Sequence, residues 1–301
     1  MCRIQKFNPR ETRLYFGILG PTEALVDNTE VPIPATRLRV ILAGLLLYSN
    51  RVVSIDRIAY FLWGEELPPS AVATVRTYIM RLRRTLGPQA ADRIATKAPG
   101  YIIKLRPGES DLATFFDLRK KAADLDTEDK VVDASATLSS ALALWRNAPL
   151  LDVPSPALQD MEVPPLLELR MQTLEWRIDL DLQLGRHAQL VPELSHMVRE
   201  HPLRESLTAK LMIALHGAGR QSDALAVFLR TRTLLIEQLG SEPGQELRDV
   251  QRLILSLNRD NSSPIPQPRP SMRTGGNARV SHPDNRWRHR TGVLGLRGYG
   301  S

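Results

Sequence analysis

The chain has 301 residues and a formal net charge of +7, from 40 Lys and Arg against 33 Asp and Glu. That length accommodates two domains of ordinary size and a tail. The longest apolar run, Val40–Tyr48, is too short to span a membrane, and the single cysteine, Cys2, excludes an intrachain disulfide or a cysteine-rich zinc site.

The first predicted elements form a small antiparallel sheet. Residues 1–13 are polar and basic and lack the apolar stretch of a signal peptide, so we expect a flexible N-terminus and a cytoplasmic protein. Short β-prone runs follow, separated by Gly20-Pro21 and by Asn28-Thr29. These runs are Leu14–Leu19, Leu25–Asp27 and Glu30–Ile33.

Two buried helices are predicted next. Thr36 is positioned to cap an apolar helix that reaches about Tyr48. Ser54 caps a second helix, Ser54–Trp63, and Gly64 ends it. A loop with two acids and two prolines then leads to the following helix.

A helix that begins at Ala71 has one apolar face and one basic face. The apolar residues recur with helical spacing and form one stripe, Val75, Ile79, Leu82 and Leu86. No acid occurs in residues 71–91, so the opposite face carries uncompensated positive charge. A face of Arg, Thr and Tyr suits a DNA major groove, where Arg reads guanine. That face comprises Thr74, Thr77, Tyr78, Arg81 and Arg84, with Arg76 and Arg83 on its flanks.

A basic hairpin follows this helix. The β-prone segments Arg93–Ala95 and Tyr101–Leu105 flank a tip that contains Lys97, Pro99 and Gly100. A helix followed by such a hairpin is the layout of a winged helix-turn-helix. On charge alone, a solvated surface helix with an Arg-rich face is an alternative of equal weight.

From Asp111 onward nearly every segment predicts helix. The expected helices include Asp111–Leu125, Lys130–Arg146, Pro165–Leu184, His187–Glu200, Gln221–Gln238 and Pro243–Leu257. Among them, Asn147–Pro165 has five prolines, and we expect this long connector at the surface rather than in the core. Gly185-Arg186 and Gly219-Arg220 stand 34 residues apart and each opens a helix, which is the tetratricopeptide period. Stacked helix pairs of this kind leave a groove for a partner.

Charge divides the chain into three parts. Residues 1–106 hold 16 basic and 8 acidic side chains, residues 107–258 hold 16 and 23, and residues 259–301 hold 8 and 2. A basic first part is expected of a protein that contacts phosphates, whereas an acidic middle part repels DNA and fits a protein partner. Residues 259–301 lack apolar periodicity, and we predict a disordered basic tail there.

Catalytic and metal-binding motifs do not occur in the sequence. It contains no phosphate-binding Gly-rich loop, no nucleophile elbow and no paired-histidine metal motif. Four histidines in the helical region are not spaced at i, i+4, which favours satisfied or solvated side chains over metal ligands. They are His187, His196, His201 and His216. We therefore predict no enzymatic activity, no cofactor and no metal.

Several of these motifs resemble the OmpR-type winged-helix DNA-binding domain. The matching pieces are Phe61-Leu62-Trp63-Gly64, Thr74-Val75, Ile79-Met80-Arg81-Leu82-Arg83-Arg84 and Gly100-Tyr101. The motif Gly17-Ile18-Leu19-Gly20-Pro21 and the long helical region restrict the resemblance to a smaller group of proteins that have this domain. Together they are similar to the SARP family (Streptomyces antibiotic regulatory proteins), over residues 14–258.

The resemblance implies a mostly α fold. A winged helix-turn-helix with a small β-sheet and a wing hairpin would occupy residues 14–106. An all-α, tetratricopeptide-like bacterial transcriptional activation domain would occupy residues 107–258. The implied DNA contacts are Thr74, Thr77, Tyr78, Arg81, Arg83 and Arg84 on the helix and Lys97 on the wing.

The function implied by the resemblance is sequence-specific activation of transcription. Such proteins bind direct repeats in double-stranded promoter DNA as a homodimer or head-to-tail pair and recruit RNA polymerase holoenzyme. They act in the cytoplasm, at the nucleoid when bound and without a membrane, usually on a secondary-metabolite (antibiotic) biosynthesis cluster. Two other functions stay open: a protein-interaction scaffold built on the helical repeats, and a repressor that acts by promoter occupancy.

Some details of the implied interface also have alternatives. Arg83 pairs either with DNA or with the acidic loop Glu65–Ser70, and that loop is either a contact surface or a simple connector. Met80 stands where such helices often carry a basic residue, which implies a different base preference. The short wing tip, with Lys97 as its one charge, implies shallow insertion into the minor groove.

Overall fold

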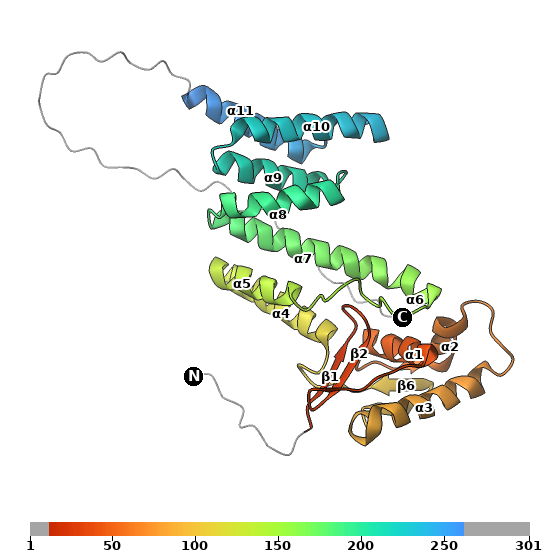
Figure 1. Cartoon of the computed structure of the whole chain (residues 1–301). Helices are drawn as coiled ribbons and strands as arrows, with labels where there is room; N and C mark the ends of the chain where they lie inside the picture. Colours follow the sequence, from red (N-terminus) through yellow and green to blue (C-terminus); the bar gives the residue numbers. More distant parts are fainter. Residues whose placement is uncertain (1–11, 262–301) are drawn as a thin grey trace, which may run out of the picture. The chain divides into compact units, whose positions relative to one another are not determined.

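The computed structural model describes residues 12–261, and its N-terminal part contains three helices and two small antiparallel sheets (Figure 1). The first sheet has the order β1-β2-β3, with β1 Leu14–Gly17, β2 Glu23–Val26 and β3 Thr29–Glu30. The second has the order β4-β6-β5, with β4 Val53–Ser54, β6 Gly100–Ile103 and β5 Ile94–Lys97. The helices are α1 Thr36–Leu47, α2 Ile55–Trp63 and α3 Ala71–Ala91. This arrangement is the predicted winged helix-turn-helix.

Local sequence signals set some of the helix ends, but not all of them. The Ser54 hydroxyl accepts a hydrogen bond from the backbone N–H of Arg57 and caps α2, as predicted. At α1 the prediction was wrong, because Ala35 is the N-cap residue and no side chain caps this helix. In α3, Gly87 adopts a positive φ of 77° and interrupts the helix just before Pro88.

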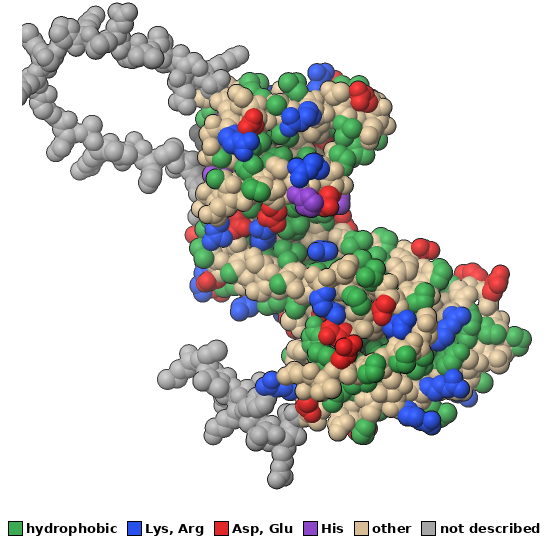
Figure 2. All heavy atoms as spheres, in the orientation of Figure 1, with side chains coloured by type: hydrophobic (Ala, Val, Ile, Leu, Met, Phe, Trp, Pro, Cys, Tyr) green, Lys and Arg blue, Asp and Glu red, His purple; other side chains and the backbone are tan. Residues whose placement is uncertain are grey.

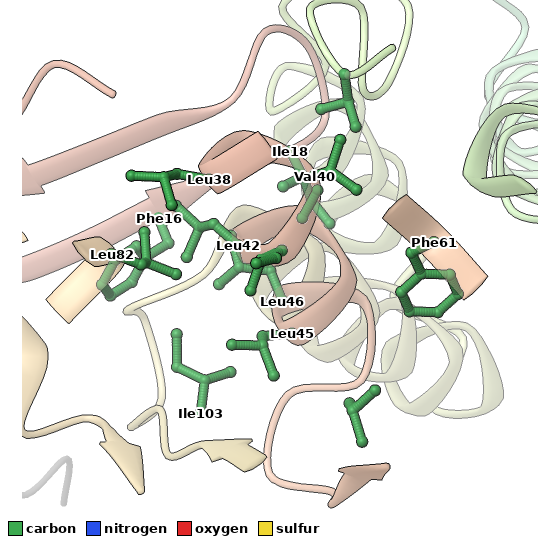
Figure 3. Close-up of a cluster of buried hydrophobic side chains, with 14 of the residues drawn as sticks. Phe16, Ile18, Leu38, Val40, Leu42, Leu45, Leu46, Phe61, Leu82 and Ile103 are labelled. Atoms are coloured by element: carbon green, nitrogen blue, oxygen red, sulfur yellow. The ribbon is translucent and has the colours of Figure 1, made fainter. Parts of the chain in front are cut away.

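The core of the winged helix lies between its helices and its two sheets. α1 is buried on almost every side, since it packs against α2, α3 and β6 together. Figure 3 shows Leu42, Leu45 and Leu46 of α1 among Phe16, Phe61 and Leu82. The predicted stripe of α3 points into this core, and Val75, Ile79, Leu82 and Leu86 are each at most 2% exposed. Burial of the stripe turns the opposite face of α3 toward solvent.

The second part of the chain is helical throughout. Its helices are α4 Asp111–Thr127, α5 Val131–Leu142, α6 Pro156–Met161, α7 Val163–Gln183, α8 His187–Glu200, α9 Glu205–Gly217, α10 Gln221–Leu239 and α11 Gln245–Asn261. The predicted helix Lys130–Arg146 is shorter than expected, since α5 ends at Leu142. Successive helices from α7 to α10 pack on one another, and Gly185 and Gly219 form the turns with φ of 73° and 75°. This stacking is the predicted tetratricopeptide-like repeat.

The expectation of a surface connector at Asn147–Pro165 was wrong. Leu150, Val153 and Leu158 are each at most 1% exposed, and the segment contains the short helix α6. Two of its prolines, including Pro156, mark helix starts, because they lie at the first positions of α6 and α7. The buried residues of the segment are the apolar ones between the prolines. The Ser155 hydroxyl donates to the carbonyl oxygen of Phe61 at 2.6 Å, so the segment is fastened to α2.

One hydrophobic core runs from the winged helix into the first helices of the helical part. Phe115 and Trp145 belong to the same buried cluster as Phe16 and Phe61, and the rings of Phe115 and Trp145 meet edge to face at 5.3 Å. The predicted domain boundary between residues 106 and 107 therefore falls within a continuous core. The winged helix and the helical part are therefore joined by packing as well as by the chain.

The buried carboxylate of Asp111, the first residue of α4, reinforces this junction. Its Oδ2 accepts the backbone N–H groups of Ile18 and Leu19 at 2.7 and 2.8 Å, and its Oδ1 accepts that of Leu112 at 2.7 Å. Arg146 approaches Oδ2 at 3.3 Å. Burial raises the pKa of Asp111, although the three backbone hydrogen bonds and Arg146 oppose that shift.

A second polar contact ties the end of α1 to the start of α7. Tyr48 donates a hydrogen bond to Glu162 and accepts one from Arg57, whose guanidinium lies 4.1 Å from the Tyr48 ring centroid. Burial and the hydrogen bond to Glu162 raise the pKa of Tyr48 to about 12. This contact therefore stabilises the protonated form of the Tyr48 side chain.

The flexible N-terminus predicted for residues 1–13 and the disordered tail predicted for residues 259–301 lie almost entirely outside the described residues. The last described helix, α11, runs to Asn261 and so extends past its predicted end at Leu257. None of the described helices has the length and hydropathy that crossing a lipid bilayer requires.

Candidate nucleic-acid interface

The solvent-facing side of α3 combines basic and apolar side chains. Arg76, Arg81 and Arg84 are exposed, and none of these three arginines forms an ion pair with a described residue. Met80 is 61% exposed between them. Figure 2 shows blue Lys and Arg side chains, with green apolar ones between them, over the part of the surface that α3 forms. A polyanion would supply the counter-charge that the described part of the chain does not.

The polar residues predicted on this face differ in how far they reach solvent. Thr74 and Thr77 are half-buried, and the Thr77 hydroxyl donates to the carbonyl oxygen of Ala73 at 3.1 Å. That bond leaves Thr77 with its methyl group and an oxygen lone pair for a ligand. Tyr78 is also half-buried and packs against the hydrophobic core, so it lies at the edge of the face rather than on it.

Arg83 links α3 to the wing formed by β5 and β6. Its Nε and Nη2 donate to the carbonyl oxygen of Ile94 at 3.0 and 2.7 Å, and Nη2 also donates to the Thr96 hydroxyl at 3.1 Å. The guanidinium lies 5.8 Å from the ring centroid of Tyr101. Arg83 thus bonds to the wing, not to the acidic loop that the sequence offered as its alternative partner.

The wing itself is held close to α2 by a glycine. A Cβ atom on Gly100 would lie 1.9 Å from the carbonyl oxygen of Val53, so only glycine allows β4 and β6 to pair at this point. Lys97 pairs with Gly100 in the hairpin, and its side chain is exposed at the tip. The wing therefore presents one cation beside the end of the basic face.

A groove of about 600 Å³ separates α3 from the wing tip. Arg76, Thr77 and Met80 line it from the helix, and Thr96 and Pro99 line it from the wing. From the sequence alone, Arg76 is assigned to a flank of the basic face and no contact is predicted for Met80. The helical spacing could have predicted that both residues line the interface, because burial of Ile79 and Leu82 turns positions 76 and 80 outward.

The chemistry of this surface suits the recognition of an anionic partner. The helix offers guanidinium donors, hydroxyl groups and apolar groups, and the wing adds the ammonium group of Lys97. Within residues 12–261 no group of three or more His, Cys, Asp or Glu side chains is placed to hold a metal ion. Arginine donors on a helix of this kind match the acceptor groups that guanine presents in a major groove.

Comparisons with known proteins agree with this geometry. Residues 29–103 match the family "Transcriptional regulatory protein, C terminal", and residues 110–255 match the "Bacterial transcriptional activator domain". The regulatory protein DnrI of Streptomyces peucetius is 37% identical over 251 residues, which are 80% of this chain and 92% of DnrI. The chain belongs to the SARP family. It is a DNA-binding transcription regulator of the OmpR type, with a bacterial transcriptional activator domain.

Other SARP relatives are larger. The regulatory protein AfsR of Streptomyces coelicolor is 40% identical over 246 residues, which cover 81% of this chain but 24% of AfsR, so the chain spans about a quarter of that relative. A solved structure of Mycobacterium tuberculosis EmbR, in complex with a low affinity phosphopeptide, superposes with a TM-score of 0.78 at 31% identity. That superposition covers 82% of this chain and 66% of EmbR.

Proposed function

We propose that this SARP protein activates transcription by placing α3 in the major groove of promoter DNA and recruiting RNA polymerase. The observation that carries the proposal is the acid-free face of α3. Arg76, Arg81 and Arg84 have no ion-pair partner there among residues 12–261, on a helix whose other face is buried in the core. Unpaired arginines on a rigid helix are suited to bidentate contacts with guanine.

Each predicted contact residue has a proposed role. Arg81 and Arg84 read bases, and Thr74 and Thr77 contact bases or phosphates beside them. Lys97 contacts a phosphate from the wing tip. Tyr78 and Arg83 lie at the edge of the interface, where Arg83 fixes the wing and its free Nη1 group faces the backbone of the DNA.

The helical part is proposed to contact protein. Residues 107–258 carry 23 acidic and 16 basic side chains, so they are repelled by DNA. The continuous core fixes this part relative to α3, which supports the recruitment of polymerase beside the bound site. By family membership, we propose that two copies bind promoter direct repeats head to tail, in the bacterial cytoplasm and at the nucleoid. The proposed target is an antibiotic biosynthesis cluster.

Selection of binding sites followed by transcription in vitro tests the proposal. The full chain is used to select sites from random duplex DNA, and a promoter with two selected sites in direct repeat is transcribed with bacterial RNA polymerase holoenzyme. We expect more transcript with the wild-type chain and no increase with the double variant Arg81→Ala, Arg84→Ala. Arg230→Ala, which removes an exposed arginine from α10, is the matched control and should behave as wild type.

Three other outcomes contradict the proposal. Transcript that falls when the wild-type chain is added would identify a repressor that acts by occupancy. Failure to select any site, with no salt-dependent binding to duplex DNA, would favour a protein-interaction scaffold. Selected sites without any repeat would leave the DNA binding intact but contradict the head-to-tail pair.

A further inference from the structure

The exposed face of α3 carries apolar side chains at its centre, beside one arginine there and two more on its flanks. With 3.6 residues per turn, Ala73, Thr77, Met80 and Arg84 fall within a sector about 60° wide, opposite the buried stripe. Three of these four positions present methyl or thioether groups, because the Thr77 hydroxyl is bonded to the Ala73 carbonyl. A helix face that merely kept the protein in solution would not place its most exposed apolar side chain there.

Met80 is that side chain. Its 61% exposure is larger than that of any other large hydrophobic residue in the described part of the chain. It borders the groove between α3 and the wing, together with Arg76 and Thr77. The surrounding arginines and the absence of acid on α3 make a nucleic acid the complementary occupant of this surface.

In the major groove one base group matches an apolar side chain. Thymine presents a C5-methyl group, whereas the other edges present hydrogen-bond donors and acceptors. A thioether opposite those edges would displace water without replacing its hydrogen bonds, which is unfavourable. Met80 therefore favours thymine and disfavours the other bases at the position that it covers.

We infer that Met80 is a specificity-determining residue that selects thymine through its C5-methyl group, between guanines read by the flanking arginines. This inference rests on the proposed DNA binding by α3. It predicts a half-site whose centre contains thymine. The long, unbranched side chain adapts its conformation to the methyl group without moving the helix.

Replacing thymine by deoxyuridine in the selected site tests the inference, since it removes only the methyl group. Each thymine is replaced in turn, and affinity is measured for the full chain and for Met80→Ala. We expect one replacement to weaken wild-type binding roughly fourfold, the value of one buried methyl group. Met80→Ala should bind both duplexes equally, so that the two changes are not additive.

Two controls keep the test specific. Leu229→Ala removes a 57% exposed side chain from α10 and should keep the full sensitivity to deoxyuridine. Met80→Arg should change the preferred base at the same position from thymine to guanine. The melting temperature of each variant shows whether it is folded. Because Met80 is exposed, we expect its replacement to leave the melting temperature unchanged.

The contrary results are distinct from one another. If wild type tolerates every deoxyuridine while still preferring its selected site, the thymine inference is wrong and the proposed function stands. If Met80→Ala keeps the sensitivity of wild type, another residue contacts the methyl group. If wild type shows no preference for any DNA sequence, the proposed function itself fails.

Discussion

The replacement Asp111→Ala tests how the winged helix is joined to the helical part. Asp111 is fully buried, and its Oδ2 accepts two backbone N–H groups from residues 18 and 19, across the junction. Ile18 and Leu19 are themselves 0% exposed, so water cannot replace the lost acceptor. The replacement therefore leaves these two buried donors across the junction without partners, in addition to the backbone N–H of Leu112 within α4.

The expected loss follows from these two donors. Each unsatisfied buried N–H costs about 1–3 kcal/mol, which gives a range of about 2–6 kcal/mol for the pair. Removing a carboxylate whose pKa is raised by burial offsets part of that cost. We therefore expect the free energy of unfolding to fall by about 3 kcal/mol, a large share of a typical 5–15 kcal/mol.

Urea unfolding of the full chain, followed by circular dichroism, measures this change. Asp117→Ala, which removes an exposed acid from the same helix, is the control and should stay within about 0.5 kcal/mol of wild type. Asp111→Asn keeps one carbonyl acceptor and should lose less than Asp111→Ala. A loss for Asp111→Ala no larger than that of the control would refute the role assigned to this carboxylate.

Two further predictions concern the wing and the contact at the end of α1. Lys97→Ala should weaken binding to all DNA sequences alike and reduce the slope of log affinity against log salt by roughly one unit; a sequence-dependent loss would mean that the wing reads bases. Tyr48 should ionise near pH 12, above the ordinary value of a tyrosine side chain, in an absorbance titration. Because its folded pKa is raised, its contribution to stability is complete below pH 10 and declines as the pH rises through 12. Glu162→Gln should lower that pKa, and an unchanged titration would contradict the assigned hydrogen bond.

Periodicity made the elements of the fold predictable, but not their polar contacts. The stripe Val75 to Leu86 repeats with helical spacing, so the buried face of α3 followed from the sequence. Arg83 was different, because its partner is the carbonyl oxygen of Ile94, and backbone acceptors leave no mark in a sequence. The acidic loop before α3 offered the visible but incorrect partner.

The segment Asn147–Pro165 shows that a high proline content does not place a whole segment at the surface. Its buried residues, such as Leu150 and Leu158, have no regular spacing because each fills a separate gap beside the winged helix. The structural role of Asp111 could not be predicted either, since an acid after Ser110 is typical of an ordinary helix start. Its contact with residues 18 and 19 depends on the tertiary fold alone.

Binding of Arg81→Ala to the selected site and to random duplex DNA tests most directly whether α3 reads bases. Fluorescence anisotropy at one fixed salt concentration gives both affinities for wild type and variant. A base contact predicts a loss of about 1–3 kcal/mol on the selected site, with relaxed sequence preference and little change on random DNA. An equal loss on both DNAs would make Arg81 a phosphate contact, and undiminished binding to both would contradict the placement of α3 in the major groove.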